Sequence, residues 1–367
     1  MERAGSGEVN LQEGRRWPRL AQNHRRRSAT ESQTVRKSPR DGPPPHLAVR
    51  FRSGDSSRMA RLKMLRRMIF DGRGKPPHPE ARPEPASWSD EAITGSCLGH
   101  STVFLNFFGV RVLTDPVFSE RVGPGVPPFI LGPKRYLAPA LKPKELPAPD
   151  VILLSHAHFD HFDIWSLRKF DRNTPVVTAR HTSDLLRCHR FRNVRELDWG
   201  ESTTIETRRG SIRCTGLEVA HWGARLMRDE HRGYNAYLLE RGDHRICYAG
   251  DTAYTGAFAR LYSPQRPIDL MLMPIGAYDP WIRAHCTPEQ AAAMARAAGA
   301  RTVVPIHHET FQLSAEAMDE PARRLRAAFS AEPHRLLAVR VGETFRVPLR
   351  KVEAPCGEPL ATSATCG

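Results

Sequence analysis

The chain has no long apolar run and no closely spaced pair of cysteines. None of its 367 residues belong to an apolar stretch of 18 or more, so no membrane-spanning helix is predicted. Its seven cysteines are dispersed, odd in number and without a C-x-x-C pair, which is typical of a reducing compartment rather than a disulfide framework. No apolar segment follows the early arginines, so no secretory signal is predicted. We therefore expect a cytoplasmic protein.

The formal net charge of +15 is concentrated near the N-terminus. Residues 1–85 contain 20 Lys and Arg against 9 Asp and Glu, a surplus of 11, whereas the remainder has a surplus of only 4. A strongly basic chain often binds nucleic acid or an anionic membrane face. Because the remainder is nearly balanced and has no RNA-binding motif, the charge does not favour a nucleic-acid partner.

Three segments are predicted from composition. Residues 1–85 are rich in Arg and Pro and poor in apolar periodicity, so most of them are predicted to be disordered. Within them, residues 59–70 are compatible with a short basic amphipathic helix that contacts an anionic membrane, or with a solvated arm. A translation start at Met59 or later is a third interpretation. A folded domain is predicted over 86–350 and a flexible tail over 351–367.

Short β-branched runs alternate with helical stretches from about residue 90. Strands are predicted at 103–108, 110–114, 151–155, 176–178, 194–197, 212–219, 234–239, 246–249, 270–274, 302–306 and 344–347. Helices are predicted at 164–170, 183–189, 253–262, 288–298 and 315–329. Thr287 is expected to cap the fourth helix, with Pro288 in its first turn and Gly299 at its end. The pattern predicts an α/β protein with a layered sheet sandwich covered by helices.

Residue types that bind metals are concentrated in the segment SHAHFDHFD, residues 155–163. His156 and His158 follow a predicted strand, and their two-residue spacing points both imidazoles to one side. Asp160 and His161 follow on the same loop. Several histidines packed together would repel one another once protonated, whereas a divalent metal takes neutral imidazole and carboxylate as ligands. A lone buried histidine is usually structural, but this cluster indicates a metal site.

The H-x-H-x-D-H motif resembles that of the metallo-β-lactamase-fold hydrolases, whose αββα sandwich holds two metals at one edge. The resemblance implies three further ligands, each just after a predicted strand: His221 in EVAHW, Asp251 in YAGDT and His307 in VVPIHH. It implies two ligand sets with Asp251 shared between them: His156, His158 and His221, and Asp160, His161 and His307. His308 is a second choice for His307, because alternation turns it to the other side of the strand end.

A closer resemblance is to one branch of these hydrolases, the N-acylphosphatidylethanolamine-hydrolysing phospholipase D and its bacterial relatives. The matching segments occur in the family's order: LGHST (98–102), LTDPVFSERVGP (113–124), GPKRY (132–136), ELDW (196–199), AGDTAY (249–254), PIGAYDP (274–280) and HHETF (307–311). L-ascorbate-6-phosphate lactonase and other hydrolases share the TDP, H-x-H-x-D-H and GDT segments. The alternative is therefore a lactonase, or a hydrolase of a small phosphate or carboxylate ester.

The resemblance implies a phospholipase D-like phosphodiesterase that acts on an N-acyl phospholipid or a related phosphodiester. Two divalent ions, expected to be Zn²⁺ with Fe or Mn as alternatives, would hold a bridging hydroxide that attacks phosphorus. Asp251 would bridge the metals, and Asp160 would also position the nucleophile's proton. His285 would position substrate or transfer a proton to the leaving group, unless it is only a helix-entry histidine.

Three aromatic residues are candidate substrate contacts. Tyr278 and Trp281 are predicted at the mouth of the pocket, and Trp222, beside a ligand, is predicted in its wall or in the core. The expected partners are a phospholipid or small phosphorylated substrate, the periphery of an anionic membrane, and a second copy of the chain, as in the dimeric phospholipases of this branch. A ribonuclease and a non-catalytic binder are the remaining classes, and the complete ligand set disfavours the binder.

Four more residues have a predicted role in or near the site. Asp115 in TDP is expected to accept a hydrogen bond from a ligand histidine, and His100 is expected to support the ligands from behind. Lys134 and Arg135 are open to two interpretations, as contacts to a phosphate or as exposed charges on a loop.

Overall fold

The computed structural model describes residues 74–226 and 229–349, which lie in one compact unit of the chain. The predicted helix at 59–70 and the predicted tail at 351–367 fall outside the described residues. Residues 77–85, at the end of the predicted basic segment, lie against the domain. Pro83 and Pro85 are buried there, and the carbonyl of Pro77 accepts a hydrogen bond from the Ala138 amide at 2.8 Å. Within the described part, no helix has the length and apolar character needed to cross a membrane.

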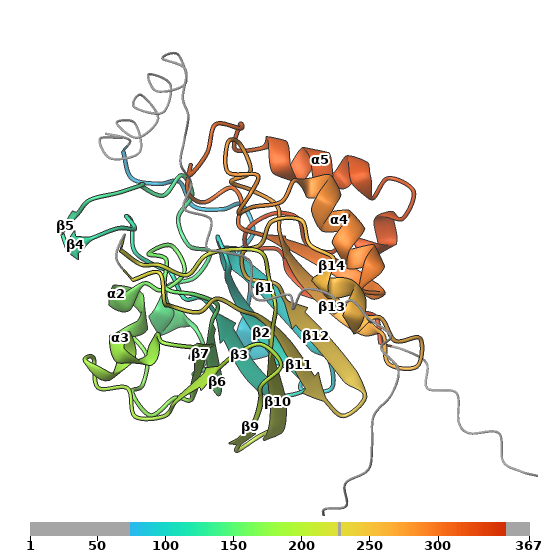
Figure 1. Ribbon diagram of the computed structural model, residues 1–367, viewed down its shortest axis with the longest axis horizontal. Coiled ribbons are helices and arrows are strands. Elements are labelled where there is room, and N and C mark those ends of the chain that lie inside the picture. Colours follow the sequence, from blue (N-terminus) through green and yellow to red (C-terminus); the bar gives the residue numbers. More distant parts are fainter. Residues whose placement is uncertain (1–73, 227–228, 350–367) are drawn as a thin grey trace, which may run out of the picture. The chain divides into compact units, whose positions relative to one another are not determined.

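Two mixed β-sheets form the centre of the domain (Figure 1). The first has the strand order β15 (Thr344–Arg346), β1 (Ile93–Gly99), β2 (Thr102–Phe107), β3 (Val110–Thr114), β6 (Val151–Leu154), β7 (Val176–Ala179), β8 (Val194–Leu197). The second has the order β14 (Ala300–Ile306), β13 (Ile268–Pro274), β12 (His244–Tyr248), β11 (Ala236–Arg241), β10 (Gly210–Leu217), β9 (Ser202–Thr207). A separate hairpin pairs β4 (Gly125–Val126) with β5 (Phe129–Ile130).

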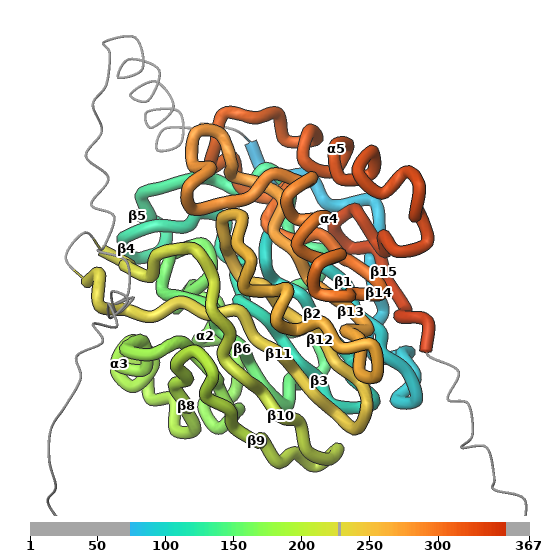
Figure 2. The backbone as a smooth tube through the Cα atoms, turned by 45° about the vertical axis from the view of Figure 1, so that its right-hand side comes forward, coloured from blue at the N-terminus to red at the C-terminus, as the bar shows by residue number. Residues whose placement is uncertain are grey.

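Helices lie on the outer faces of the two sheets. Beside the first sheet are α2 (Ile164–Leu167) and α3 (Ser183–Arg187), and over the second are α4 (Pro288–Ala297) and α5 (Glu320–Ala328) (Figures 1 and 2). Short 3₁₀ turns connect these elements: η1 (Pro85–Ser87), η2 (Pro143–Glu145), η3 (Ala257–Leu261) and η4 (Pro333–Arg335). The predicted αββα sandwich is therefore confirmed.

Side-chain alternation on β2 shows how the layers are held together. Val103 and Leu105 belong to the core between the two sheets, whereas Phe104 belongs to the cluster that packs against α2 and α3. Since successive residues of a strand point to opposite faces, a strand buried on both sides must be apolar throughout. This is why so many of the sequence's apolar runs are continuous rather than alternating.

Most predicted elements are confirmed to within a few residues. Thr287 caps α4 through the Gln290 amide, with Pro288 in the first turn, as the sequence predicts. Strands β1 and β9 and the β4–β5 hairpin were not predicted. The helix predicted at 253–262 is wrong, because only the 3₁₀ turn η3 forms there. The Ala253 amide donates to the carbonyl of Ala220 instead of starting a helix.

Strand direction brings the sequence motifs to one edge of the sandwich. In the first sheet, β3 and β6 are parallel to each other. In the second sheet, β12, β13 and β14 are parallel, and β10 has the same direction because it pairs with β11 in the antiparallel sense. The loops that follow these strands therefore emerge at the same edge, which is where polar side chains can converge without disturbing the core.

Arg135 is neither an exposed loop charge nor a phosphate contact. Its residue is 1% exposed, and its guanidinium donates to the backbone carbonyls of Ser119, Val117 and Leu137. The ring of Phe311 lies 5.0 Å from the guanidinium carbon. Burial lowers the pKa of Arg135 to about 10, so the side chain remains charged at neutral pH. Both interpretations of Arg135 from sequence are wrong, because the side chain turns inward to bond loop carbonyls.

Replacing Arg135 by methionine should lower the free energy of unfolding by about 2–4 kcal/mol, because three buried carbonyls lose their donor. Urea unfolding followed by circular dichroism measures the change. The matched control is Arg208→Met in the exposed β9–β10 turn, which should stay within about 0.5 kcal/mol of the parent. Equal effects of the two substitutions would contradict the structural role of Arg135.

Candidate metal centre

The predicted metal ligands come together from four loops at one edge of the two sheets. His156, His158, Asp160 and His161 follow β6 in the first sheet. The other three follow strands of the second sheet: His221 after β10, Asp251 after β12 and His307 after β14. Their side chains, together with His100 after β1, form overlapping groups whose ligand atoms lie within 4.8 Å of one another.

The first group consists of three histidines. The Nε2 atom of His156 lies 2.8 Å from Nδ1 of His158, and Nε2 of His221 lies 3.3 Å from the same atom. These distances between nitrogens are close to those of a tetrahedral zinc site. There, ligand nitrogens about 2.0–2.1 Å from the metal lie roughly 3.3 Å from one another. Burial and the neighbouring imidazoles lower the pKa of all three, which favours the neutral form that binds metals.

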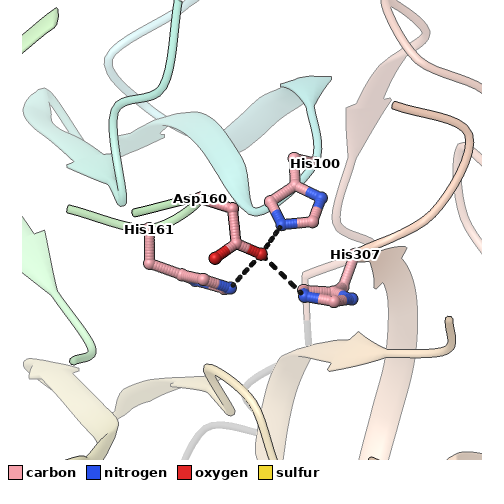
Figure 3. Close-up of side chains that lie close together, drawn as sticks. All are labelled: His100, Asp160, His161 and His307. Atoms are coloured by element: carbon pink, nitrogen blue, oxygen red, sulfur yellow. Dashed lines mark hydrogen bonds and ion pairs between the residues drawn. The ribbon is translucent and has the colours of Figure 1, made fainter. Parts of the chain in front are cut away.

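The second group surrounds the carboxylate of Asp160 (Figure 3). Its Oδ2 atom lies 3.0 Å from Nε2 of His100 and 3.7 Å from Nε2 of both His161 and His307. Burial alone lowers the pKa of His161 and His307, but the nearby carboxylates outweigh it and raise the first well above its usual value and the second to about 9. The two carboxylates therefore draw positive charge to this group, which either protons on the two rings or a divalent cation can supply.

Asp251 lies between the two groups. Its Oδ2 atom is 3.1 Å from Nε2 of His161 and 3.0 Å from Nε2 of His307 in the second group. The same oxygen is 3.9 Å from Nε2 of His221 in the first group. One carboxylate thus faces donors of both sets, which is the position that a residue shared by two metals must occupy.

Asp115 orients two of the histidines from behind. Its carboxylate accepts hydrogen bonds from Nδ1–H of His161 at 2.6 Å and from the amide of Ser155 at 2.7 Å, and it also accepts from the hydroxyls of Ser155 and Tyr248. Because the Ser155 hydroxyl donates to Asp115, it accepts from Nδ1–H of His156 at 2.9 Å. The expected hydrogen bond from a candidate ligand histidine to Asp115 is confirmed.

These outer hydrogen bonds select the tautomer of three histidines, His156, His161 and His221. His221 donates its Nδ1–H to the carbonyl of Ala284 at 2.8 Å, as His161 and His156 do to oxygens of the Asp115 network. The Nε2 lone pair of each ring is then left to point into the cluster. Such outer partners are the usual support of metal-binding histidines, since they fix ring orientation and raise basicity.

Several buried polar atoms within the cluster have no hydrogen-bond partner in the described part of the chain. They include Nε2 of His161, both ring nitrogens of His307 and Oδ1 of Asp251. Leaving such atoms unsatisfied costs about 1–3 kcal/mol each, so a group of them at one point needs an explanation. The donor set, its charge and its inward lone pairs all fit divalent metal ions.

The backbone around the cluster adopts conformations that few residues tolerate. His100 and His307 have positive φ angles of 56° and 61°. Gly250, directly before Asp251, has φ 57°, and a Cβ atom there would lie 2.8 Å from Cβ of Ser155. The glycine of the GDT segment therefore allows the second sheet to approach the loop after β6. Strained backbone of this kind is concentrated at functional sites.

The remaining candidates lie at different distances from the cluster. Nδ1 of His285 is 3.8 Å from Oδ2 of Asp251, and His285 forms a further group with His221 and Asp251 that could hold a metal ion. Trp222 is 53% exposed, and its ring centroid lies 4.4 Å from that of His158. His308 is buried outside the metal-ligating groups of the described residues, with Nδ1 3.8 Å from Glu309.

Tyr278 and Trp281 have hydrogen bonds to neighbouring protein groups. The hydroxyl of Tyr278 donates to Glu320 at 2.8 Å, and the indole N–H of Trp281 donates to the carbonyl of Leu313 at 3.1 Å. Their predicted substrate contacts stay predictions. Of the three aromatic candidates, Trp222 is the one with a ring contact to the cluster.

Two residues that support the site were missed by sequence reasoning. Tyr248 donates to Asp115 from β12, whereas the sequence predicts only a strand at its position. Arg225 donates to the carbonyls of Ala157 and Phe162, at either end of the loop that carries the first ligands. The sequence gives no local signal for Arg225, whereas an internal Tyr two residues before GDT is a weak one.

Replacing Asp115 by asparagine should weaken divalent-metal binding by about 10–100-fold, because the amide cannot accept from all four donors. Competition with a chromophoric chelator measures the affinity. The control is Asp269→Asn, a carboxylate that is also buried but lies at the start of β13 and accepts from the Arg245 amide. Unchanged affinity in Asp115→Asn would show that the network does not support the ligands.

Comparison with known proteins identifies the family. The profile described as "Beta-lactamase superfamily domain" matches residues 110–308. An uncharacterized protein of Mycobacterium tuberculosis (strain H37Rv) is 32% identical over 281 residues, which cover 74% of this chain and 71% of that protein. The N-acyl-phosphatidylethanolamine-hydrolyzing phospholipase D 1 of Caenorhabditis elegans is 29% identical over 259 residues, which cover 66% of this chain and 71% of that protein.

A solved structure agrees with this assignment at the level of the fold. The isothiocyanate hydrolase from Delia radicum gut bacteria superposes with a TM-score of 0.54 at 19% identity, covering 69% of this chain and 98% of that one. At such low identity the likeness concerns the fold alone. On the match over residues 110–308 and the convergent donor groups, the chain belongs to the β-lactamase superfamily and is a metal-dependent hydrolase with the metallo-β-lactamase fold.

Proposed function

We propose that this hydrolase is a phosphodiesterase that uses two divalent metal ions, expected to be Zn²⁺, on an N-acyl phospholipid or a related phosphodiester. The observation that carries the proposal is the pairing of two donor groups through Asp251, whose Oδ2 lies 3.1 Å from His161 and 3.9 Å from His221. The likeness to the phospholipase of Caenorhabditis elegans supports the choice of substrate class.

The donor groups divide the expected work between two ions. His156, His158 and His221 would hold one ion, and Asp160, His161 and His307 the other, with Asp251 shared. A pair of divalent ions supplies a hydroxide nucleophile at neutral pH and stabilises the charge that develops at phosphorus. The protein supplies the fixed lone pairs, because the Asp115 network holds the imidazoles of His156 and His161 in one tautomer.

Residues at the rim would act on the substrate itself. Asp160 is 17% exposed at its side chain, so its carboxylate can reach a proton on the nucleophile. His285 borders both donor groups, with its ring centroid 5.1 Å from those of His221 and His307. From there it can position the phosphodiester or transfer a proton to the leaving oxygen. Trp222 supplies an exposed apolar wall beside His158.

Replacing Asp251 by asparagine should reduce bound metal from about two ions per chain to about one and lower turnover by at least 10³-fold, because the shared carboxylate is lost. Elemental analysis of purified protein gives the metal content, and circular dichroism verifies the fold. The control is Asp269→Asn, for which both properties should be those of the parent. A parent protein that is folded but contains no metal would overturn the proposal, whatever its activity.

Substrate class is tested by a panel of an N-acyl phospholipid, bis(p-nitrophenyl) phosphate, a lactone and single-stranded RNA. We expect turnover of the N-acyl phospholipid and of bis(p-nitrophenyl) phosphate, with a higher kcat/KM for the lipid. His285→Gln should lower kcat by about 10²-fold, the usual range for loss of a proton-transfer group, and leave metal content unchanged. Turnover of the lactone alone would assign the small-molecule alternative instead.

A further inference from the structure

The β4–β5 hairpin exposes three large apolar side chains within six residues. Val126 is 61% exposed, Phe129 82% and Leu131 62%. A single exposed apolar residue is ordinary, but a contiguous group of them marks an interaction site. These three residues are called the apolar tip.

The hairpin that presents the apolar tip is tightly built. A Cβ atom at Gly125 would lie 2.2 Å from the carbonyl oxygen of Phe129, and one at Gly132 would lie 2.0 Å from that of Val122. Arg121 donates to the carbonyl of Gly132 at 2.8 Å and so holds the base of the hairpin. Because the backbone of the hairpin is closely packed, the hairpin has a defined conformation that holds the apolar tip in an exposed position.

A largely apolar cleft lies beside the hairpin and reaches the loop that carries the first ligands. Gly125 and Ile130 of the hairpin line the cleft together with Phe159 and Trp165. Phe159 directly precedes Asp160, whose carboxylate belongs to the second donor group. An apolar chain that enters beside the hairpin would therefore lie next to the loop that carries the metal ligands.

The segment that carries α2 and α3, which lines part of this cleft, is basic. Residues 164–192, which include α2 and α3, contain seven Lys and Arg against two Asp. Arg168 and Lys169 are exposed at the end of α2. His189 lines the cleft, and its pKa is lowered by burial and by the positive charges of Arg168, Arg172 and Arg225. The exposed cations Arg168 and Lys169 are called the basic rim.

We propose that the apolar tip and the basic rim together dock this enzyme on an anionic lipid bilayer. An element of this kind buries its apolar side chains at the boundary between headgroups and acyl chains. Cations beside it gain about 1 kcal/mol each near an anionic surface. The cleft between the two would then open toward the bilayer, at the side from which a lipid substrate has to enter.

Charge distinguishes this occupant from two others. In a two-fold dimer built on this face, the basic rim would be brought close to its own copy, and like charges would repel. A nucleic acid would be held by phosphate contacts and stacking, for which the aliphatic side chains of Val126 and Leu131 are of little use. A bilayer with anionic headgroups is complementary to both the apolar tip and the basic rim.

The docking surface gives the proposed phosphodiesterase a membrane partner. Only its expected effect on lipid turnover rests on the proposed function. Sedimentation of the full-length chain with phosphatidylcholine vesicles, with or without phosphatidylglycerol, tests the binding directly. Binding should require the anionic lipid and decline as salt is raised. Phe129→Ser should weaken it by about 10-fold, the loss expected when an aromatic side chain no longer leaves water.

Two further variants make the test specific. Exchange of Arg168 and Lys169 for glutamate should abolish the preference for anionic vesicles. Tyr262→Ser is the matched control, because Tyr262 is 61% exposed in the segment after η3, outside the hairpin and the rim, and its loss should leave binding unchanged. Turnover of bis(p-nitrophenyl) phosphate without vesicles should be the same in all variants.

Each outcome has one meaning. Equal vesicle binding by Phe129→Ser and the parent would overturn the docking surface, even if the soluble phosphodiester is hydrolysed. A parent dimer that Phe129→Ser converts to a monomer, with vesicle binding unchanged, would assign the apolar tip to self-association and also overturn it. Vesicle binding that depends on Phe129 in a protein that hydrolyses no phosphodiester would support the docking surface and refute the proposed function alone.

Discussion

The buried carboxylate of Asp115 is the group on which the rest of the centre depends. It follows β3 in the first sheet and accepts from Tyr248 on β12 in the second, so a single side chain joins the two sheets at the edge where the ligands emerge. The same carboxylate accepts from His161 directly and from His156 through the hydroxyl of Ser155. Sheet packing and ligand orientation are therefore fixed by one hydrogen-bond network.

Charge balance explains why so many polar groups can be buried together. The outward-facing ring nitrogens of His156, His161 and His221 all have oxygen acceptors, whereas Oδ1 of Asp251 and both ring nitrogens of His307 form no hydrogen bond among the described residues. A half-satisfied polar network costs more than an apolar core. Divalent cations on the inward side would bind the unsatisfied atoms of this network. The ligands are already held in place by the outer hydrogen bonds, so binding has little ordering entropy left to offset.

The sequence predicts the centre better than its supports. The H-x-H-x-D-H spacing and the position of Asp115 after a strand depend on local chain geometry, which a sequence contains. No local pattern reveals the contacts that support the centre, because they join segments far apart in the chain. Arg135 bonds buried loop carbonyls, Tyr248 donates to Asp115, and Arg225 donates to the loop that carries the ligands. The hairpin was missed because the glycines and prolines of residues 123–132 are typical of a loop.

The sharing of Asp251 by two metal ions is tested most directly by anomalous X-ray diffraction from crystals of the zinc-loaded protein. We expect two peaks about 3.5–4 Å apart. One should lie against His156, His158 and His221, the other against Asp160, His161 and His307, and the carboxylate of Asp251 should contact both. A single peak, or two peaks that Asp251 does not join, would contradict it.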